Sequence, residues 1–169
     1  GTFFFADTTV NVDPDLNAFM DIISLTIERI RAFDIEPVIA VLSYSNFGSA
    51  PGEQANRMAD VVEQAKSRFP DVVIDGEIQV NVALQPELLE QAYPFSSLVG
   101  NRVNTLIFPN LSSGNIAYKL LGELGGGELI GPILMGMHRP VQVLQMGAVS
   151  REIVHMTALA VLDAQLASA

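Results

Sequence analysis

The sequence contains no cysteine, and this absence excludes three kinds of chemistry. A chain with 0 Cys among 169 residues cannot form disulfide bridges, thiolate metal sites or a cysteine nucleophile. Disulfides belong to oxidising compartments, and their absence agrees with a cytoplasmic protein, which is the location we expect.

Basic residues are scarce as well. The chain has 9 Lys and Arg against 19 Asp and Glu, which gives a formal net charge of −10. A nucleic-acid partner requires a basic face, so we expect none. A small anionic ligand would have to be held by backbone amides and a few local cations, because the overall field repels it.

Long hydrophobic runs are missing too. A membrane-spanning helix needs about 20 consecutive apolar residues, and the longest runs here are far shorter, so we expect no contact with a membrane. Phe3–Phe5 is too short for a signal peptide, and no basic region precedes it. Even so, 49% of the residues are hydrophobic and only 17% are charged. This composition predicts buried parallel strands, or a surface that is covered in an assembly.

The stretch Thr105–Gly127 shows how the chain is organised. Thr105–Phe108 is an apolar run of strand formers that ends before a proline. A polar loop follows, in which Ser112 or Ser113 can cap a helix, and the glycines at 125–127 are expected to end that helix. The buried face of the helix is expected to consist of Ile116, Ala117, Leu120 and Leu124.

Strands and helices are expected to alternate along the rest of the chain. Further strands are expected at Thr2–Phe5, Val38–Leu42, Val72–Ile74, Glu128–Met135 (with Ile133–Met135 as its apolar core) and Val141–Leu144. Helices are expected from an Asp13 cap to Phe33, over Ala55–Phe69, over Pro86–Ala92, and from a Ser150 cap onward with Ile153, Val154, Ala158, Val161 and Leu162 on its apolar face. Ile78–Leu84 fits either a strand or a helix. The alternation predicts an α/β fold with a largely parallel sheet, built as a single domain over residues 1–169.

Two polar loops, Ser43–Ser49 and Asn110–Asn115, follow the carboxyl ends of expected strands. Ligands bind at such ends in open α/β sheets, beside the free N–H groups of a helix start. The alternative is that both are ordinary connections whose serines and asparagines serve as caps. Lys119 either reaches an anion at the loop or lies on a solvated face. The candidate ligand contacts are Ser43, Ser45, Asn110, Ser112, Ser113, Asn115 and Lys119.

Other chemical groups favour structural roles. Asp75-Gly76-Glu77 could hold a hard cation or form an acid/base pair, but a solvated turn is the preferred interpretation and we expect no metal site. His138 beside Arg139 could form a small cationic site, although a turn before a strand is favoured. His155 is expected to be a hydrogen-bonded structural histidine in the last helix. No serine spacing suggests a nucleophilic triad.

Six segments, in order and nearly end to end, resemble the phosphate acetyl/butyryltransferase family. They are FADTTVNVDP (Phe5–Pro14), VLSYSNFGS (Val41–Ser49), DGEIQ (Asp75–Gln79), FPNLSSGNIAYKLLGELGG (Phe108–Gly126), IGPILMGMHRPVQVL (Ile130–Leu144) and the final helix. The resemblance implies a three-layer αβα fold like that of the isocitrate and isopropylmalate dehydrogenases. It covers only the carboxyl-terminal half of such a protein, so we expect a domain excised from a longer chain.

Several positions depart from the family pattern. The family's Ser-Arg pair, which precedes a glycine, falls on Gln145-Met146, its catalytic aspartate on Glu152, and a further arginine on Glu123. The lysine of its serine-rich loop is absent, with Phe47 in that region. Methionine and glutamate cannot supply the guanidinium charge that stabilises an acyl-phosphate transition state. The resemblance therefore implies vestigial catalytic positions.

The family contains free phosphate acetyltransferases and the carboxyl-terminal domains of large bacterial NADP-dependent malic enzymes. FADTTVNVDP resembles the malic-enzyme variant more closely, and this implies a regulatory and assembly domain that senses acetyl-CoA and forms homo-oligomers, at least dimers. The parent would oxidatively decarboxylate malate to pyruvate, with NADP and a divalent metal held outside this domain, which itself has no cofactor. The alternatives are a working acetyltransferase that moves acetyl between CoA and phosphate with Glu152 as its base, and a purely structural oligomerisation module with a vestigial cleft.

Overall fold

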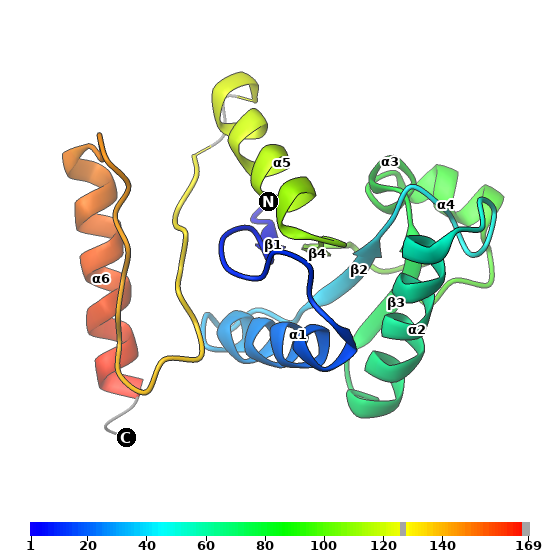
Figure 1. The fold of residues 1–169 in the computed structure, drawn as a ribbon, viewed down its shortest axis with the longest axis horizontal. Helices are drawn as coiled ribbons and strands as arrows, with labels where there is room; N and C mark the ends of the chain where they lie inside the picture. Colours follow the sequence, from blue (N-terminus) through cyan, green and yellow to red (C-terminus); the bar gives the residue numbers. More distant parts are fainter. Residues whose placement is uncertain (126–127, 167–169) are drawn as a thin grey trace. The chain divides into compact units, whose positions relative to one another are not determined.

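The structure is a computed structural model that describes residues 1–125 and 128–166. The chain divides into two compact units, an N-terminal unit of Gly1–Tyr118 and a C-terminal unit of Lys119–Ala169. Figure 1 shows the elements in chain order. The expected single domain over residues 1–169 stays a prediction.

The N-terminal unit is built on a four-stranded parallel sheet. Its strands are β1 (Phe4–Ala6), β2 (Val38–Leu42), β3 (Val73–Ile78) and β4 (Thr105–Ile107). Their order is β1-β4-β2-β3, and every pair is parallel. The expected α/β fold with a parallel sheet is confirmed. β3 runs on to Ile78, and so includes the Asp75–Glu77 segment that the sequence places in a turn.

Helices connect the strands. They are α1 (Leu16–Arg31), α2 (Glu53–Arg68), α3 (Val80–Ala83), α4 (Pro86–Ala92), α5 (Leu111–Leu124) and α6 (Ser150–Leu166). α4 has the expected bounds, and the ambiguous Ile78–Leu84 segment is the end of β3 followed by α3. The expected Asp13 cap of α1 is wrong, because Asp15 accepts the hydrogen bond from the Ala18 N–H at 2.8 Å. Asp13 instead pairs with Arg57 at 2.8 Å.

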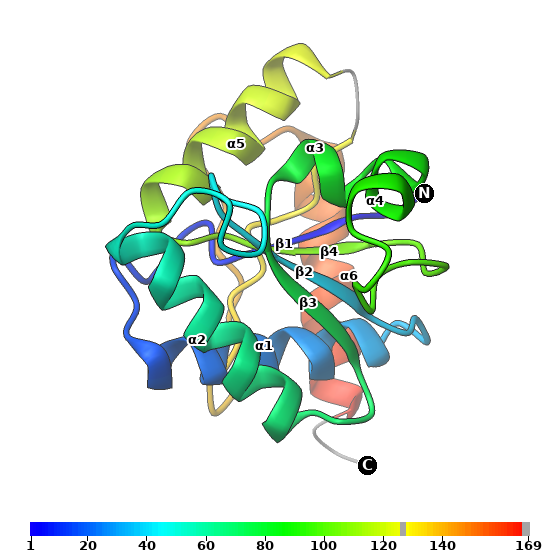
Figure 2. The same ribbon diagram turned by 90° about the vertical axis from the view of Figure 1, so that its right-hand side faces the viewer.

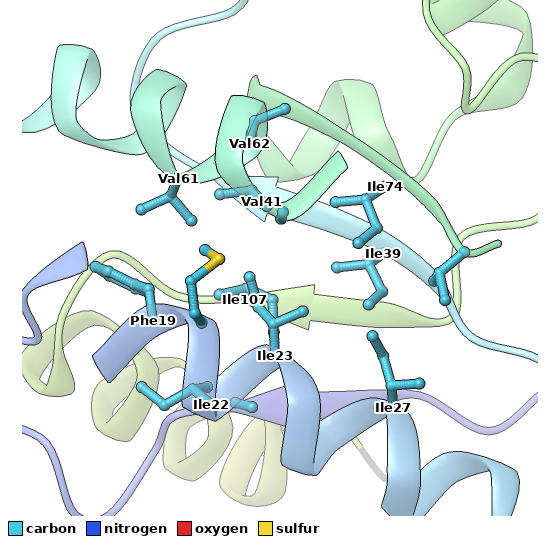
Figure 3. Close-up of a cluster of buried hydrophobic side chains, with 14 of the residues drawn as sticks. Phe19, Ile22, Ile23, Ile27, Ile39, Val41, Val61, Val62, Ile74 and Ile107 are labelled. Carbon is cyan, nitrogen blue, oxygen red and sulfur yellow. The ribbon is translucent and has the colours of Figure 1, made fainter. Parts of the chain in front are cut away.

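Two apolar clusters cover the two faces of the sheet. Successive side chains of a strand point to opposite faces, so Ile39 and Val41 of β2 enter one cluster and Ala40 and Leu42 the other. Figure 3 shows Ile39, Val41, Ile74 and Ile107 facing apolar side chains of α1 and α2. The second cluster includes residues of α3, α4 and the connector that precedes β4, and α3 and α4 lie across the sheet from α1 and α2 (Figure 2).

The C-terminal unit lacks the strands expected at Glu128–Met135 and Val141–Leu144. Within the described residues, the segment between α5 and α6 has no regular secondary structure. A strand's backbone N–H and C=O groups need a neighbouring strand, and none of the described strands pairs with these segments. The two predictions are therefore wrong for this chain.

Of the face expected for α5, Ala117 packs against the second apolar cluster, but the rest of that face and most of the face expected for α6 are exposed. Ile116 is 63% exposed and Leu124 is 78% exposed, while Met156 is the buried residue of α6 in the described chain. Gly125 continues the helical hydrogen bonding, since its N–H donates to the Leu121 carbonyl at 2.7 Å. The remaining glycines of the expected stop, at 126–127, lie outside the described residues. None of the described helices combines the length and apolar character that crossing a bilayer requires.

Candidate ligand site at the carboxyl edge of the sheet

Loops follow the carboxyl ends of β1, β2 and β4, and in a parallel sheet these ends share one edge. The loop after β1 is organised by the carboxylate of Asp7, which accepts hydrogen bonds from the backbone N–H groups of Thr9, Val10 and Asn11 at 2.7, 3.1 and 2.7 Å. The side-chain amide of Asn11 donates a fourth at 2.7 Å. Burial raises the pKa of Asp7, but these hydrogen bonds outweigh it and hold the pKa below its usual value.

The N-terminus of α5 is capped by Asn110. Its Oδ1 accepts from the Ser113 N–H at 2.9 Å, and the Ser113 hydroxyl donates back to the Asn110 carbonyl at 2.9 Å. The expected Ser112 or Ser113 cap is therefore wrong. The Leu111 N–H donates to the carbonyl of Val12 at 3.1 Å. Protein groups thus already use two of the first N–H groups of α5, which leaves fewer for an anion than the loop sequence suggests.

The loop after β1 packs directly on α5. Gly114 is buried, and a Cβ at this position would lie 2.3 Å from the Asp7 carbonyl oxygen. The Asn115 side-chain amide donates to the Thr8 carbonyl at 3.1 Å. Asn110, Ser113 and Asn115 are therefore brought together as a framework that joins this loop to the helix.

The loop after β2 holds the other two candidate serines. Ser45 is fully buried, and its hydroxyl oxygen accepts from the Ala50 N–H at 3.1 Å. Ser43 is half-buried, and its hydroxyl oxygen accepts from the Ser45 N–H at 3.3 Å. The Ser45 side chain thus supports the loop from inside. Ser112 and Lys119 are exposed on α5. Ligand contact by any of the seven candidates stays a prediction.

Arg57 is a residue of this edge that sequence reasoning missed. It comes from α2, and its Nη2 pairs with Asp13 Oδ1 at 2.8 Å and lies 3.4 Å from the Pro109 carbonyl oxygen. Its Nε is buried and has no hydrogen-bond partner among the described residues. Arg57 therefore joins α2 to the loop after β1 and to the end of β4. Its position on a mostly polar helix gave no sequence signal of this role.

The Asp75-Gly76-Glu77 segment is buried, so the expected solvated turn is wrong. Asp75 is 4% exposed and Glu77 is 3% exposed. Asp75 accepts hydrogen bonds from Lys66 Nζ at 2.5 Å, the Ser96 hydroxyl at 2.8 Å and the Ser97 N–H at 2.7 Å. In the part of the chain that the structure describes, no group of three or more His, Asp or Glu could hold a metal ion.

Asp75 makes the stability of the fold sensitive to acid. Burial raises its pKa, but the hydrogen bonds from Lys66, Ser96, Ser97 and Gly76 outweigh burial and hold the pKa below its usual value. A carboxylate with a lowered pKa in the folded state stabilises fully above its unfolded pKa of about 3.9, and that contribution is lost as the pH falls through the folded value.

We expect Asp75→Asn to lower the free energy of unfolding at pH 7 by about 1.5–3 kcal/mol, the range for a hydrogen bond to a charged group. The difference from the parent should shrink below pH 4. Urea unfolding at pH 7, 5 and 3 measures this. Asp60→Asn, which removes an exposed carboxylate of α2, is the matched control. A constant difference across this pH range would contradict the prediction.

The vestigial positions belong to the C-terminal unit. Gln145, Met146 and Glu123 are exposed, and the Met146 side chain is fully so. Glu152 Oε2 accepts from the Val149 N–H at 2.9 Å, in the first turn of α6. Ser150 is the first residue of that helix rather than its expected cap. These groups supply no positive charge.

The two histidines also lie in the C-terminal unit. His138 and Arg139 are exposed in an irregular segment, and no described strand follows them. His155 is half-buried, and its Nδ1 lies 3.5 Å from Glu128 Oε1, while Arg151 binds the other oxygen of the same carboxylate. His155 thus lies beside a carboxylate, and its expected role as a hydrogen-bonded structural histidine stays a prediction.

Comparisons with known proteins agree on the family. A family model described as "Phosphate acetyl/butaryl transferase" matches residues 1–161. The chain is 42% identical over 166 residues to the NADP-dependent malic enzyme of Salmonella typhimurium, covering 98% of this chain and 22% of that protein. It is 39% identical over 166 residues to the phosphate acetyltransferase of Clostridium acetobutylicum, covering 98% of this chain and 50% of that protein.

A solved structure shares the fold. The crystal structure of a phosphotransacetylase from Streptococcus pyogenes matches with a TM-score of 0.86 at 38% identity, covering 97% of this chain and 49% of that one. The chain thus spans half, or less, of the length of these proteins. The match over nearly all of its own length shows that the chain belongs to the phosphate acetyl/butyryltransferase family.

Proposed function

We propose that this chain is a non-catalytic regulatory and assembly domain of an NADP-dependent malic enzyme, and that it senses acetyl-CoA. The parent would decarboxylate malate oxidatively to pyruvate in the cytoplasm. NADP and a divalent metal would be held in a part of the parent outside this domain. We also propose that the helices on both faces of the sheet complete a three-layer αβα fold of the isocitrate and isopropylmalate dehydrogenase type.

The proposal is supported by the lack of positive charge at the positions where the family carries arginines. Acyl transfer to phosphate gathers negative charge in its transition state, and guanidinium groups stabilise that charge. Met146 supplies an uncharged thioether and Glu123 a negative charge. Glu152, in place of the aspartate, already accepts the Val149 N–H.

The identities alone do not choose between the two kinds of relative. They are 42% to the malic enzyme and 39% to the acetyltransferase. The FADTTVNVDP segment supports the malic-enzyme kind, and in this structure its Asp7 and Asn11 form a closed hydrogen-bonded loop.

Acetyl-CoA would bind at the carboxyl edge of the sheet. Ser112 is exposed there on α5 and Ser43 is half-buried on the loop after β2, and Lys119 is exposed further along α5. Lys119 would supply a positive charge to the ligand in a protein of net charge −10. A coupling of about 1–3 kcal/mol between this site and the malate site would be typical of an allosteric effect.

Calorimetry on the intact enzyme tests the proposal. Acetyl-CoA should release heat on binding and change the rate of malate decarboxylation. We expect Lys119→Ala to weaken binding about tenfold, because a charge-assisted hydrogen bond contributes about 1.5 kcal/mol or more. Arg68→Ala, which removes an exposed cation from the last turn of α2, should leave binding unchanged. Absence of both the heat and the rate change would refute the proposal.

We further propose that the parent self-associates through this region. Large apolar side chains of α5 and the C-terminal unit are exposed, and monomers rarely expose large apolar patches. The exposed residues include Ile116, Leu120, Leu121, Leu124, Ile130, Met137, Val141, Val143, Leu144, Ile153, Val154 and Val161. Equal activity of Lys119→Ala and the parent at every acetyl-CoA level would favour a purely structural module.

A working phosphate acetyltransferase is the second candidate. The 39% identity to the Clostridium protein and the TM-score of 0.86 to the Streptococcus phosphotransacetylase support it. Glu152 would then act as the base, and other cations would replace the missing arginines.

A further inference from the structure

A buried carboxylate at the end of β3 holds the loop that follows β2. Glu77 Oε1 accepts a hydrogen bond from the Gly48 N–H at 2.8 Å, and the Glu77 carbonyl accepts from the Phe47 N–H at 2.8 Å. Two residues on, the Gln79 side-chain amide donates to the Tyr44 carbonyl at 2.6 Å. Glu77 therefore faces the loop with two acceptors instead of facing solvent.

Further bonds continue this pattern along the loop. The Gln79 N–H donates to Asn46 Oδ1 at 2.8 Å, and the Ser43 N–H donates to the Ile78 carbonyl at 2.9 Å. Residues 77–79 thus contact the loop from its first residue to its tip. The candidate ligand residue Ser43 is one of the groups that they fix.

The loop needs this support because its tip has an unfavourable backbone. Phe47 has φ +48° and Gly48 has φ +83°, both in the left-handed region. An aromatic residue rarely adopts that conformation, and it persists only where the surroundings impose it. Glu77 supplies a hydrogen bond to the N–H of each of these two residues.

The imposed conformation decides where the Phe47 ring lies. The ring packs 5.1 Å from the ring of Tyr93 and 5.1 Å from that of Phe95, between centroids. Phe95 is 71% exposed, so this aromatic group continues to the surface. A loop released from Glu77 would lose the two hydrogen bonds that fix its tip, and this packing with them.

We propose that Glu77 is a positioning residue, which holds the loop of residues 43–49 in the shape that binds acetyl-CoA. This inference rests on the proposed function. Glu77 is 3% exposed, so it acts through the backbone of Phe47 and Gly48 and does not touch the ligand.

Two variants of the full-length protein test this role. Glu77→Ala removes the acceptor of the Gly48 N–H, whereas Glu77→Gln keeps an oxygen acceptor at the same distance along the side chain. Hydrogen–deuterium exchange of the peptide covering residues 43–50 reports loop order, and calorimetry reports acetyl-CoA affinity. We expect Glu77→Ala to speed exchange in this peptide at least tenfold and to weaken acetyl-CoA about tenfold. Glu77→Gln should stay within about threefold of the parent in both.

A core variant separates positioning from general stability. Ile23 of α1 is fully buried in the first apolar cluster and is not a residue of the loop. Ile23→Val should destabilise the fold without changing acetyl-CoA affinity. If Glu77→Ala does not fold, Gln79→Ala takes its place in the test. This variant removes the hydrogen bond to the Tyr44 carbonyl, and we expect it to weaken acetyl-CoA binding about threefold.

Each result decides the question. Faster loop exchange with unchanged acetyl-CoA affinity would overturn the inference and leave the proposed function intact. If the unmodified protein itself gives no heat with acetyl-CoA, the proposed function fails. The role of Glu77 in ordering the loop is then tested by hydrogen–deuterium exchange alone. Faster exchange of the loop peptide in Glu77→Ala, but not in Glu77→Gln, would then support the role of Glu77 in holding the loop. Unchanged exchange in Glu77→Ala would overturn that role.

Discussion

The full-length protein, given acetyl-CoA and phosphate, should release CoA about 10⁴–10⁶ times more slowly than an active phosphate acetyltransferase. Loss of one donor to a developing negative charge costs about 10²–10³ in rate, and two positions are affected. They hold Met146 and Glu123 where the family resemblance places arginines. A thiol reagent measures the CoA released, and this part of the protein adds no thiol background because it has 0 Cys. The Clostridium acetobutylicum phosphate acetyltransferase serves as the reference.

A gain-of-function variant tests the same argument from the opposite side. Restoring the family residues with Gln145→Ser, Met146→Arg and Glu123→Arg together should raise CoA release about 10²-fold or more, because the charges return to these positions. Gln165→Arg, at an exposed position of α6, adds a cation elsewhere and should change nothing. CoA release by the unmodified protein at ordinary transferase rates would show that the active site is intact, and would favour the second candidate function.

Gly76→Ala should lower the free energy of unfolding by about 2–5 kcal/mol. Gly76 has φ +145°, and a Cβ there would lie 2.5 Å from the Val41 carbonyl oxygen, a backbone atom that cannot rotate away. A left-handed backbone costs an L-residue about 1–2 kcal/mol, and overpacking adds about 1–3 kcal/mol. The midpoint of urea unfolding measures the loss.

Gly100→Ala is the matched control for this substitution. Gly100 also has a positive φ, +77°, but a Cβ there meets nothing within 4 Å. It should therefore lose only the backbone contribution of about 1–2 kcal/mol. Equal losses for the two variants would mean that β2 and β3 move apart to accept the methyl group, and would contradict the packing argument.

Local sequence patterns were sufficient to predict the secondary structure of a segment that has all its partners nearby or is buried on both faces. Val38–Leu42 is a continuous apolar run behind a proline, and it forms β2 with the expected bounds. Pro86 begins α4 as a first helical residue should. The placement of the candidate loops at one edge also follows from the parallel order of the strands.

Partners distant in sequence explain the failures. Asp75 and Glu77 resemble a solvated turn because most of their hydrogen-bond partners are distant in sequence: Lys66, Ser96 and Gly48 donate to them in the fold. No periodicity reveals such partners. The same holds for Arg57, whose partners Asp13 and Pro109 are about fifty residues away in either direction along the chain.

Helix α5 and the C-terminal unit show a different kind of failure. Val141–Leu144 has the composition of a strand, and Ile116 and Leu124 have helical spacing. In the described chain, however, the first has no strand partner and the others are exposed. The apolar pattern indicates that these side chains need a surface to pack against, but it does not indicate whether that surface belongs to the same chain.

The position of β4 in the sheet has a consequence for synthesis on the ribosome. β1 pairs with β4 alone, and Phe4 aligns with Thr105, about a hundred residues later. At about 5–20 residues per second, β1 emerges roughly 5–20 s before its neighbour exists. During that interval Phe5, whose ring contacts Phe108 in the fold, remains uncovered, so the nascent chain should be a substrate for ribosome-associated chaperones until Phe108 has left the exit tunnel.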